Sequence, residues 1–164
     1  MSRRAPGRSD GRPPRAAQVG RGLLGAAYLL GAGIHLFLWW QDPGVYAAIT
    51  AEVLFGWYRG LWTGYVLPNL DVLLPLLAGF EFVLAGLLLS RGRAVRTGNG
   101  IGIVFQVVLA PLGFWWPTNF FLAFGHAWLA RYDFDEDALS VLRGGPGART
   151  APDAGTTLRR PDDP

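Results

Sequence analysis

Four strongly polar side chains interrupt the apolar stretches of this chain, one in each stretch: His35, Glu81, Gln106 and His126. Polar side chains inside a bilayer are costly, so they usually face a partner, a cavity or a ligand. A carboxyl group and an imidazole that meet there can share a proton, and polar groups with aromatic neighbours can hold a quinone head group. The pattern indicates a membrane helix bundle with a polar interior.

Each of these residues lies on a stripe of small residues at helical spacing. The stripes are Gly31, Ala32 and His35; Ala78, Glu81 and Ala85; Gly102, Gln106, Ala110 and Gly113; and Ala123, His126, Ala127 and Ala130. Small residues mark close helix contacts in membranes, so all four polar groups are expected to point inward. Tyr28 and Trp39 extend the first stripe and are predicted to line a pocket.

Helix direction predicts how these residues pair. Side chains lean toward the N-terminus of their helix, and consecutive spans run in opposite directions, so His35 and Glu81 converge. The same reasoning brings Gln106 and His126 together. We therefore predict a His35–Glu81 pair and a Gln106–His126 pair.

Several uses of this cluster stay open at this stage. Neutral imidazoles can ligate haem iron or another metal, but two histidines are too few for a metal site, so none is predicted and quinone is preferred to haem. Hydrogen bonds between membrane helices often serve only to fix their register, each contributing about 0.6–2 kcal/mol. That structural interpretation is favoured for Gln106 and His126. For Glu81 the structural and functional interpretations remain balanced.

The elements that must position these residues are membrane helices. Hydrophobic residues make up 51% of the 164 and charged residues 16%, as in membrane proteins. Apolar stretches near the roughly 20 residues of a bilayer span predict an all-α, integral membrane four-helix bundle within residues 19–132. Its spans are expected at about 22–40, 69–90, 98–116 and 118–132. Residues 1–18 and 133–164 are expected to be mostly disordered, with a turn of helix possible at 136–142.

Residues 41–66 are neither a span nor a polar loop. Val45, Ala48, Ile49, Val53, Trp57 and Leu61 approximate one face of a helix. Aromatic residues cluster at its end, as they do at the headgroup level of a bilayer. We predict an extra amphipathic interfacial helix between spans 1 and 2, with an ordinary structured loop as the alternative. Asp42-Pro43-Gly44 is expected to end the first span, and Thr118-Asn119 to cap the fourth.

The arginines predict the orientation. Six precede the middle of the first span, three lie at 91–97 and five follow residue 130, whereas residues 41–66 hold one and the turn at 115–119 none. Positively charged loops stay on the cytoplasmic side, which places both termini in the cytoplasm. We expect a multi-pass protein of the plasma membrane, with the lipid bilayer as its surroundings and partner.

Composition also excludes whole classes of function. The chain has no cysteine, so thiol redox exchange, iron–sulfur clusters and thiolate metal sites are excluded. The arginines flank membrane segments and form no basic-aromatic surface, which argues against nucleic-acid binding. No nucleophile–base arrangement or phosphate loop indicates a hydrolase or kinase. A stand-alone enzyme is not expected, although the sequence leaves this open.

Two segments resemble the DoxX-like family of small membrane proteins, which includes the DoxD-type small subunit of thiosulfate:quinone oxidoreductase. One is Asp42-Pro43-Gly44 followed by Tyr46, after a Gly-rich first helix. The other runs from Phe80-Glu81-Phe82 through a Gly-Leu-rich stretch to Leu89 and a basic turn. The resemblance spans about Gly20 to Tyr132 and implies an accessory or quinone-interacting subunit of a membrane redox-related complex. His35, Gln106 and His126 do not map onto functional residues of that family.

Two other functions stay open beside the one that the resemblance implies. The first is a module that binds or transports a small solute, a lipid or a proton through the Glu81–His35 pair. The second is a structural anchor that uses the Arg-rich tails to hold membrane or soluble protein partners.

Overall fold

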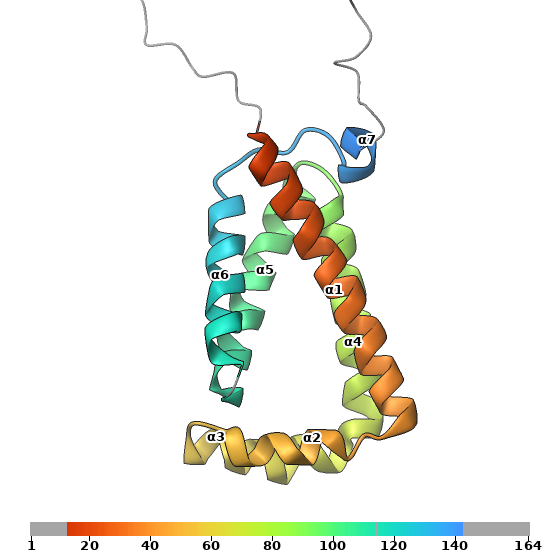
Figure 1. Cartoon of the computed structure of the whole chain (residues 1–164), viewed down its shortest axis with the longest axis vertical. Coiled ribbons are helices and arrows are strands. Elements are labelled where there is room, and N and C mark those ends of the chain that lie inside the picture. Colours follow the sequence, from red (N-terminus) through yellow and green to blue (C-terminus); the bar gives the residue numbers. More distant parts are fainter. Residues whose placement is uncertain (1–12, 114, 143–164) are drawn as a thin grey trace, which may run out of the picture.

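The computed structural model describes residues 13–113 and 115–142, and every regular element in these ranges is helical (Figure 1). In chain order the elements are α1 (Arg15–Gln41), α2 (Val45–Ala48), the 3-10 turn η1 (Ile49–Glu52), α3 (Gly56–Leu61), the π-helical turn η2 (Trp62–Val66), the 3-10 turn η3 (Leu67–Asn69), α4 (Leu70–Leu89), α5 (Arg93–Leu109), the 3-10 turn η4 (Ala110–Leu112), α6 (Trp116–Leu129) and α7 (Ala138–Leu142). The predicted all-α class is confirmed for the described residues.

Within the described residues, three helical stretches are long and apolar enough to cross a membrane. They are Arg15–Gln41 with 27 residues, Gly56–Leu89 with 34 and Arg93–Leu112 with 20. The second stretch bends, because α3 lies across the lower end of the molecule while α4 stands beside α1 (Figure 1). Large apolar side chains on these helices are exposed, among them Leu30, Phe82 and Val104. Apolar surface on this scale needs lipid or a partner to cover it, so the chain has the features of a membrane protein.

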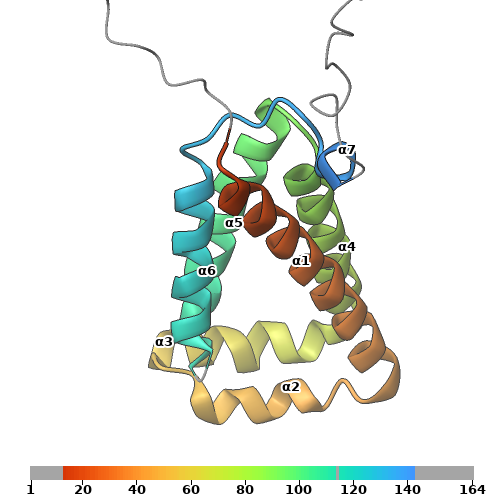
Figure 2. The ribbon, with the colours of Figure 1, turned by 45° about the horizontal axis from the view of Figure 1, so that its top comes forward.

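Four helices form an inverted V (Figure 1). α1 packs along α4 and α5 packs along α6. The two pairs meet at one end of the molecule and diverge toward the other, which the tilted view also shows (Figure 2). α1 and α5 run toward the open end while α4 and α6 return, so the two ends of the described chain lie at the closed end (Figure 1). α6 has 14 residues, fewer than any of the three apolar stretches.

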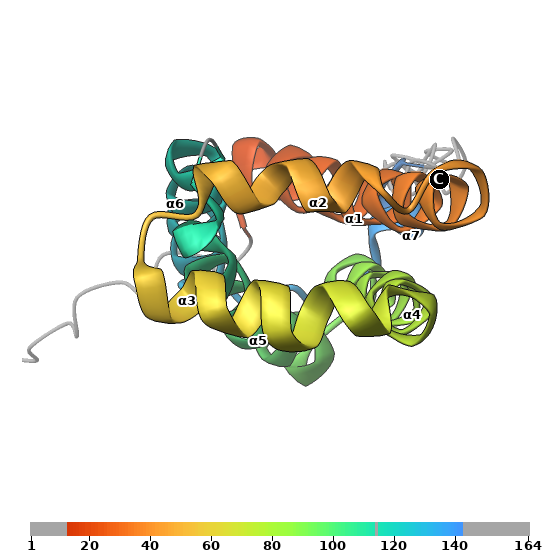
Figure 3. The ribbon, with the colours of Figure 1, turned by 90° about the horizontal axis from the view of Figure 1, so that it is seen from below.

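Residues 45–69, which we call the floor, lie across the open end of the V. The floor has two arms, α2 with η1 and α3 with η2 and η3, which lie side by side beneath the four helices (Figure 3). The first arm starts after Asp42-Pro43-Gly44, where the Gly44 N–H donates to the Asp42 carboxylate at 3.0 Å. This confirms the predicted end of the first long helix.

The single amphipathic helix predicted for residues 41–66 is wrong. Extended backbone at Val53 and Phe55 divides the segment into two arms. The division also changes the buried face: Tyr46, Val53, Tyr58 and Trp62 are buried, whereas Val45, Trp57 and Leu61 are exposed. The predicted face assumed an unbroken helical period through residue 53, which the extended backbone interrupts.

Hydrogen bonds fasten the floor to η4 and to the lower end of α5. The Leu54 N–H donates to the Pro111 carbonyl at 3.0 Å, and the Tyr58 hydroxyl donates to the Val108 carbonyl at 3.0 Å. Gly113 has φ +87°, and a Cβ atom there would overlap the carbonyl of Glu52. This close approach requires glycine, so the floor is a fixed part of the fold.

α5 and α6 begin at other residues than predicted. α5 begins at Arg93, directly after Gly92 turns the chain with φ +61°. α6 begins at Trp116 with Pro117 in its first turn, so Thr118 and Asn119 lie inside the helix and the N-cap predicted there is wrong. Proline is favoured in a first turn because its missing N–H would have no partner there.

The ordered chain also extends into both predicted tails. α1 begins at Arg15, within residues 1–18, and Ala17 is buried. Residues 133–142, which we call the strap, lie across the closed end and include α7, where a turn of helix was predicted. Phe134 of the strap is buried, and its carbonyl accepts from the Gly92 N–H at 2.6 Å. The other residues of the predicted tails lie outside the described ranges.

Arg21 holds the strap to the bundle. Its guanidinium is buried and donates to the carbonyls of Ser90 at 2.9 Å and Glu136 at 3.1 Å. The same group lies 4.4 Å from the centre of the Phe134 ring, a cation–π contact. An ion pair joins Arg96 to Asp133 at the surface.

Candidate functional site

His35 and Glu81 face each other across the contact between α1 and α4. The His35 Nε2 atom lies 3.7 Å from Glu81 Oε1, within ion-pair range and longer than a hydrogen bond. Helix packing brings the two side chains together, because α1 lies along α4. The predicted His35–Glu81 pair is confirmed.

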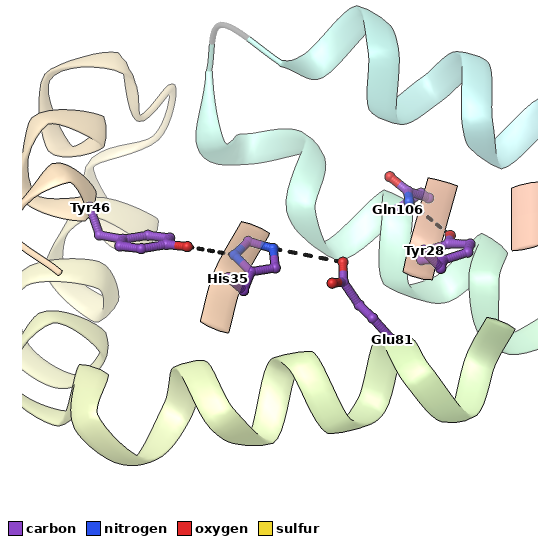
Figure 4. A network of polar contacts seen from close by, with 5 residues as sticks. All are labelled: Tyr28, His35, Tyr46, Glu81 and Gln106. Carbon is purple, nitrogen blue, oxygen red and sulfur yellow. Dashed lines mark hydrogen bonds and ion pairs between the residues drawn. The ribbon is translucent and has the colours of Figure 1, made fainter. Parts of the chain in front are cut away.

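Tyr46 of the floor is the second partner of His35. Its hydroxyl lies 2.5 Å from His35 Nδ1, so the three side chains form the series Tyr46–His35–Glu81 (Figure 4). The floor positions Tyr46, since the Trp62 indole N–H donates to the Tyr46 carbonyl at 3.3 Å. Burial raises the pKa of Tyr46 to about 12, and the negative charge of Glu81 adds to the effect, so Tyr46 keeps its proton.

Glu81 is 6% exposed, and its second oxygen has no hydrogen-bond partner among the described residues. Gly31 of α1 leaves the space for this carboxylate: a Cβ at residue 31 would lie 3.0 Å from Oε2 and 3.1 Å from Oε1. The small-residue stripe of the first helix therefore makes room for the polar side chain of α4. A buried carboxylate oxygen without a partner is costly, and protonation of the carboxylate reduces that cost.

A cavity of about 540 Å³ lies between the long helices and the floor. Its walls are mostly apolar side chains of α4 and α5, including Leu74, Leu77, Phe80, Phe105 and Leu109. Polar groups enter it from His35, Tyr46, Trp62 and Asn119. Pockets for small organic ligands have this size and this combination of apolar walls with a few polar groups.

The cavity and the series of three polar residues meet at Tyr46 and His35. Both residues line the cavity, whereas Glu81 lies on the side of His35 away from Tyr46 (Figure 4). A ligand in the cavity would reach the phenol and the imidazole directly. It would reach Glu81 only through His35.

Gln106 and His126 do not pair directly, so that prediction is wrong. Both contact the Tyr28 hydroxyl: Gln106 Nε2 donates to it at 2.9 Å, and His126 Nε2 lies 2.8 Å from it. On the other side of the imidazole, His126 Nδ1 lies 3.0 Å from Asn99 Oδ1. Tyr28 bridges the predicted pair because its phenol is long enough to reach between α5 and α6.

This second network has one consistent set of proton positions. Asn99 Nδ2 donates to the Val95 carbonyl at 3.0 Å, so Asn99 Oδ1 accepts from His126 Nδ1. His126 Nε2 then accepts from the Tyr28 hydroxyl, which accepts from Gln106. Both imidazole nitrogens are used, and His126 is 0% exposed. The structural role favoured for Gln106 and His126 fits this arrangement, which ties α1, α5 and α6 together.

The structure therefore separates the predicted site residues into three groups. His35 and Glu81 belong to the site beside the cavity, while Tyr28, Gln106 and His126 form the interhelical network. Trp39 was predicted to line a pocket, but it is 40% exposed and does not line the described cavity.

Two residues that matter here were not among the predicted site residues. Tyr46 entered the sequence analysis only through its place after Asp42-Pro43-Gly44, and Asn99 did not enter at all. Asn99 lies seven residues before Gln106, a spacing that repeats on one helical face, and this was the available signal. No local pattern marked Tyr46, because its contact depends on how the floor folds beneath α1.

Comparisons of this chain with family models, curated proteins and solved structures find no match. The chemistry of the site must therefore be argued from its geometry. No group of three or more His, Asp or Glu side chains within the described residues is placed to share a metal ion. What the site combines is an apolar cavity, a phenol and imidazole at its wall, and a buried carboxyl group behind them.

Proposed function

We propose that this chain is a DoxX-like integral membrane protein whose cavity binds a quinone-type ligand, and that it serves as an accessory subunit of a redox-related membrane complex. The observation that carries the proposal is the cavity of about 540 Å³ with His35 and Tyr46 in a mostly apolar wall. The oxygens of a quinone-type head group can hydrogen-bond with these side chains, and its ring and tail suit the apolar part of the wall. The resemblance of the Asp42-Pro43-Gly44 and Phe80–Leu89 segments to the DoxX-like family supports the same ligand class.

Electrons for this ligand would come from another subunit. The chain has no cysteine and thus no thiol, disulfide or iron–sulfur route of its own. Its residues supply binding and orientation: Tyr46 and His35 present their polar atoms to the head group, and the α4 and α5 side chains exclude water. A chain that binds and orients the ligand while another subunit supplies the electrons would be a ligand-binding subunit and not a stand-alone enzyme.

The proposed topology has four spans with both termini in the cytoplasm of a plasma-membrane protein. The return of α6 beside α5 and the gathering of arginines at the closed end support it. The absence of native cysteine permits a direct test by single substitutions. Thr97→Cys at the closed end should react with a membrane-impermeant maleimide only after permeabilisation, whereas Thr63→Cys on the floor should react in intact cells. Equal labelling of both from outside would contradict this topology.

Ligand binding is tested on protein purified in mild detergent. Native mass spectrometry and the absorbance of a solvent extract should reveal a bound quinone. Leu77→Phe, which reduces the cavity, should lower the bound fraction about tenfold. Val83→Phe, on the exposed surface of the same helix, should leave it unchanged. Quinone absent from wild-type protein, even after incubation with excess quinone, would reject the proposal.

A second candidate function is proton or small-solute transport, which the unpartnered Glu81 Oε2 atom favours. It predicts that liposomes holding the protein take up protons or solute in a manner abolished by Glu81→Gln.

The third possibility, a structural anchor, predicts that Glu81→Gln changes neither ligand binding nor flux while loss of the tails releases the partners.

A further inference from the structure

We propose that Tyr46, His35 and Glu81 form a proton path from the cavity to a buried carboxyl group, and that the ligand is therefore a hydroquinone, which carries a transferable hydroxyl proton at its head. This inference rests on the proposed function and narrows it. It assigns Tyr46 as the residue that meets the head group, and Glu81 as the residue that receives the proton without touching the ligand.

The order of the three residues carries the first part of the argument. Tyr46 and His35 both line the cavity, and Glu81 lies beyond them (Figure 4). The contacts between them are 2.5 Å from the Tyr46 hydroxyl to His35 Nδ1 and 3.7 Å from His35 Nε2 to Glu81 Oε1. The two imidazole nitrogens thus face opposite neighbours. The longer contact must shorten to hydrogen-bond distance when the proton moves from His35 to Glu81.

The donors and acceptors of this series point in one direction. An ionised Glu81 can only accept, which places the proton of a neutral His35 imidazole on Nε2. His35 Nδ1 then accepts from the Tyr46 hydroxyl. The Tyr46 oxygen keeps lone pairs that can accept a hydrogen bond from a ligand hydroxyl. A ligand that only accepts hydrogen bonds would leave this oxygen unused.

The far end of the series is suited to receive a proton. Glu81 is buried beside Gly31, its Oε2 atom has no partner among the described residues, and no arginine of the described chain forms an ion pair with it. An ionised carboxylate in such a place lacks the hydrogen bonds that compensate for burial. The arrival of a proton removes that charge.

The step balances without any change of oxidation state. The O–H bond of the ligand breaks as its proton joins the Tyr46 oxygen, while the Tyr46 proton moves to His35 Nδ1. The His35 Nε2 proton moves to Glu81 Oε1. The negative charge passes from Glu81 to the ligand oxygen, and all electron pairs stay on the atoms that held them.

The Tyr28 network does not offer a competing path. Both nitrogens of His126 are engaged by Tyr28 and Asn99, and neither Tyr28 nor His126 lines the described cavity. Tyr58, whose hydroxyl donates to the Val108 carbonyl, also lies outside the cavity lining. Tyr58→Phe is therefore a matched control for Tyr46→Phe, since both remove a buried hydroxyl of the floor.

The test uses the full chain in detergent with a decyl-substituted hydroquinone and, as a control probe, the dimethyl ether of the same molecule. Binding is followed by quenching of tryptophan fluorescence, because Trp62 and Trp115 line the cavity. Proton arrival is followed by the carbonyl stretch of a protonated carboxyl group in the infrared difference spectrum. The band should appear with the hydroquinone and be absent with the ether.

Glu81→Gln should abolish the band, and Tyr46→Phe should abolish it while weakening binding about 5- to 10-fold, the equivalent of one hydrogen bond. Tyr58→Phe removes one contact between the floor and α5 but no cavity group, so it should retain the band. A band that persists in Tyr46→Phe, that appears with the ether, or that is missing although the hydroquinone binds, would overturn the proton path. Since the two probes are compared on wild-type protein, the result does not depend on how the variants fold. Failure of both probes to bind would instead reject the proposed function.

Discussion

The imidazole of His35 and the hydroxyl of Tyr46 lie 2.5 Å apart, although one belongs to a long helix and the other to the floor beneath it. This contact joins the two parts of the molecule at the wall of the cavity. The chain between them is the end of α1, residues 36–41, and the turn at Asp42-Pro43-Gly44 that leads into the floor. The turn therefore decides whether a phenol reaches the imidazole.

Gly31→Ala should destabilise the site, whereas Gly33→Ala on the same helix should not. A Cβ at residue 31 would crowd both oxygens of Glu81, while a Cβ at residue 33 meets nothing within 4 Å. Overpacking of this kind costs about 1–3 kcal/mol, and glycine to alanine in an open helical position stabilises by roughly 0.5–1 kcal/mol. Thermal unfolding in detergent should separate the two variants. Equal midpoints would show that Glu81 moves aside freely.

Tyr28→Phe should weaken the contact of α1 with α5 and α6. The change removes the hydroxyl that donates to His126 and accepts from Gln106, so two buried groups lose a partner. The expected loss is about 1–3 kcal/mol, seen as a lower unfolding midpoint. Hydroquinone binding should stay close to wild type, because Tyr28 does not line the described cavity. A large loss of binding with unchanged stability would assign Tyr28 to the ligand site instead.

Arg21→Lys should loosen the strap. Lysine keeps the charge, but its single ammonium cannot replace two guanidinium nitrogens, of which Nη1 donates to the Ser90 and Glu136 carbonyls and Nη2 to the Gln18 side chain. The loss of about 1–1.5 kcal/mol predicts tryptic cleavage after Arg131 that is roughly 5- to 10-fold faster. Arg15→Lys, an exposed position on the same helix, is the control. Equal cleavage rates in both variants would mean that Phe134 alone holds the strap.

α7 should lose order in acid through Asp137. The Ser140 N–H donates to the Asp137 carboxylate at 2.8 Å, and this hydrogen bond holds the pKa of Asp137 below its usual range. A carboxyl group whose pKa is lower in the folded state stabilises that state above its ordinary value of 3.8, and this contribution is lost as the pH falls through the lowered value. Exchange of the Ser140 amide should accelerate over that range. Asp137→Asn should remove the pH dependence and Asp135→Asn should retain it; the reverse pattern would contradict the assignment.

The sequence was most informative where the physics is local to one helix. A polar residue on a small-residue stripe points inward whatever surrounds the helix, so the burial of Glu81 and the His35–Glu81 contact were predictable. The bridge through Tyr28 was not, because its position depends on the separation of α5 and α6. The contact of Tyr46 with His35 was also not predictable, because it depends on how the two arms of the floor fold. No periodic pattern in the sequence indicates it.

The strap shows that amino-acid composition alone can wrongly predict disorder. Its Asp-Phe-Asp-Glu-Asp sequence is typical of a disordered tail, yet Phe134 is buried and Arg21 binds the backbone around it. Phe134 and Arg21 contribute to ordering this charged segment, together with the Gly92–Phe134 backbone hydrogen bond and the Arg96–Asp133 ion pair. A count of charges along the chain does not record such a contact.

Photoaffinity labelling tests the central claim most directly, since it reports where a quinone sits. Full-length protein in lipid nanodiscs would be irradiated with a short-tailed azidoquinone, digested and analysed by mass spectrometry. The account predicts labels on cavity residues such as Tyr46, Trp62 and Phe105, suppressed by excess unlabelled quinone and reduced in Leu77→Phe. Labels confined to lipid-facing residues such as Phe82 and Val104, and unaffected by the competitor, would contradict it.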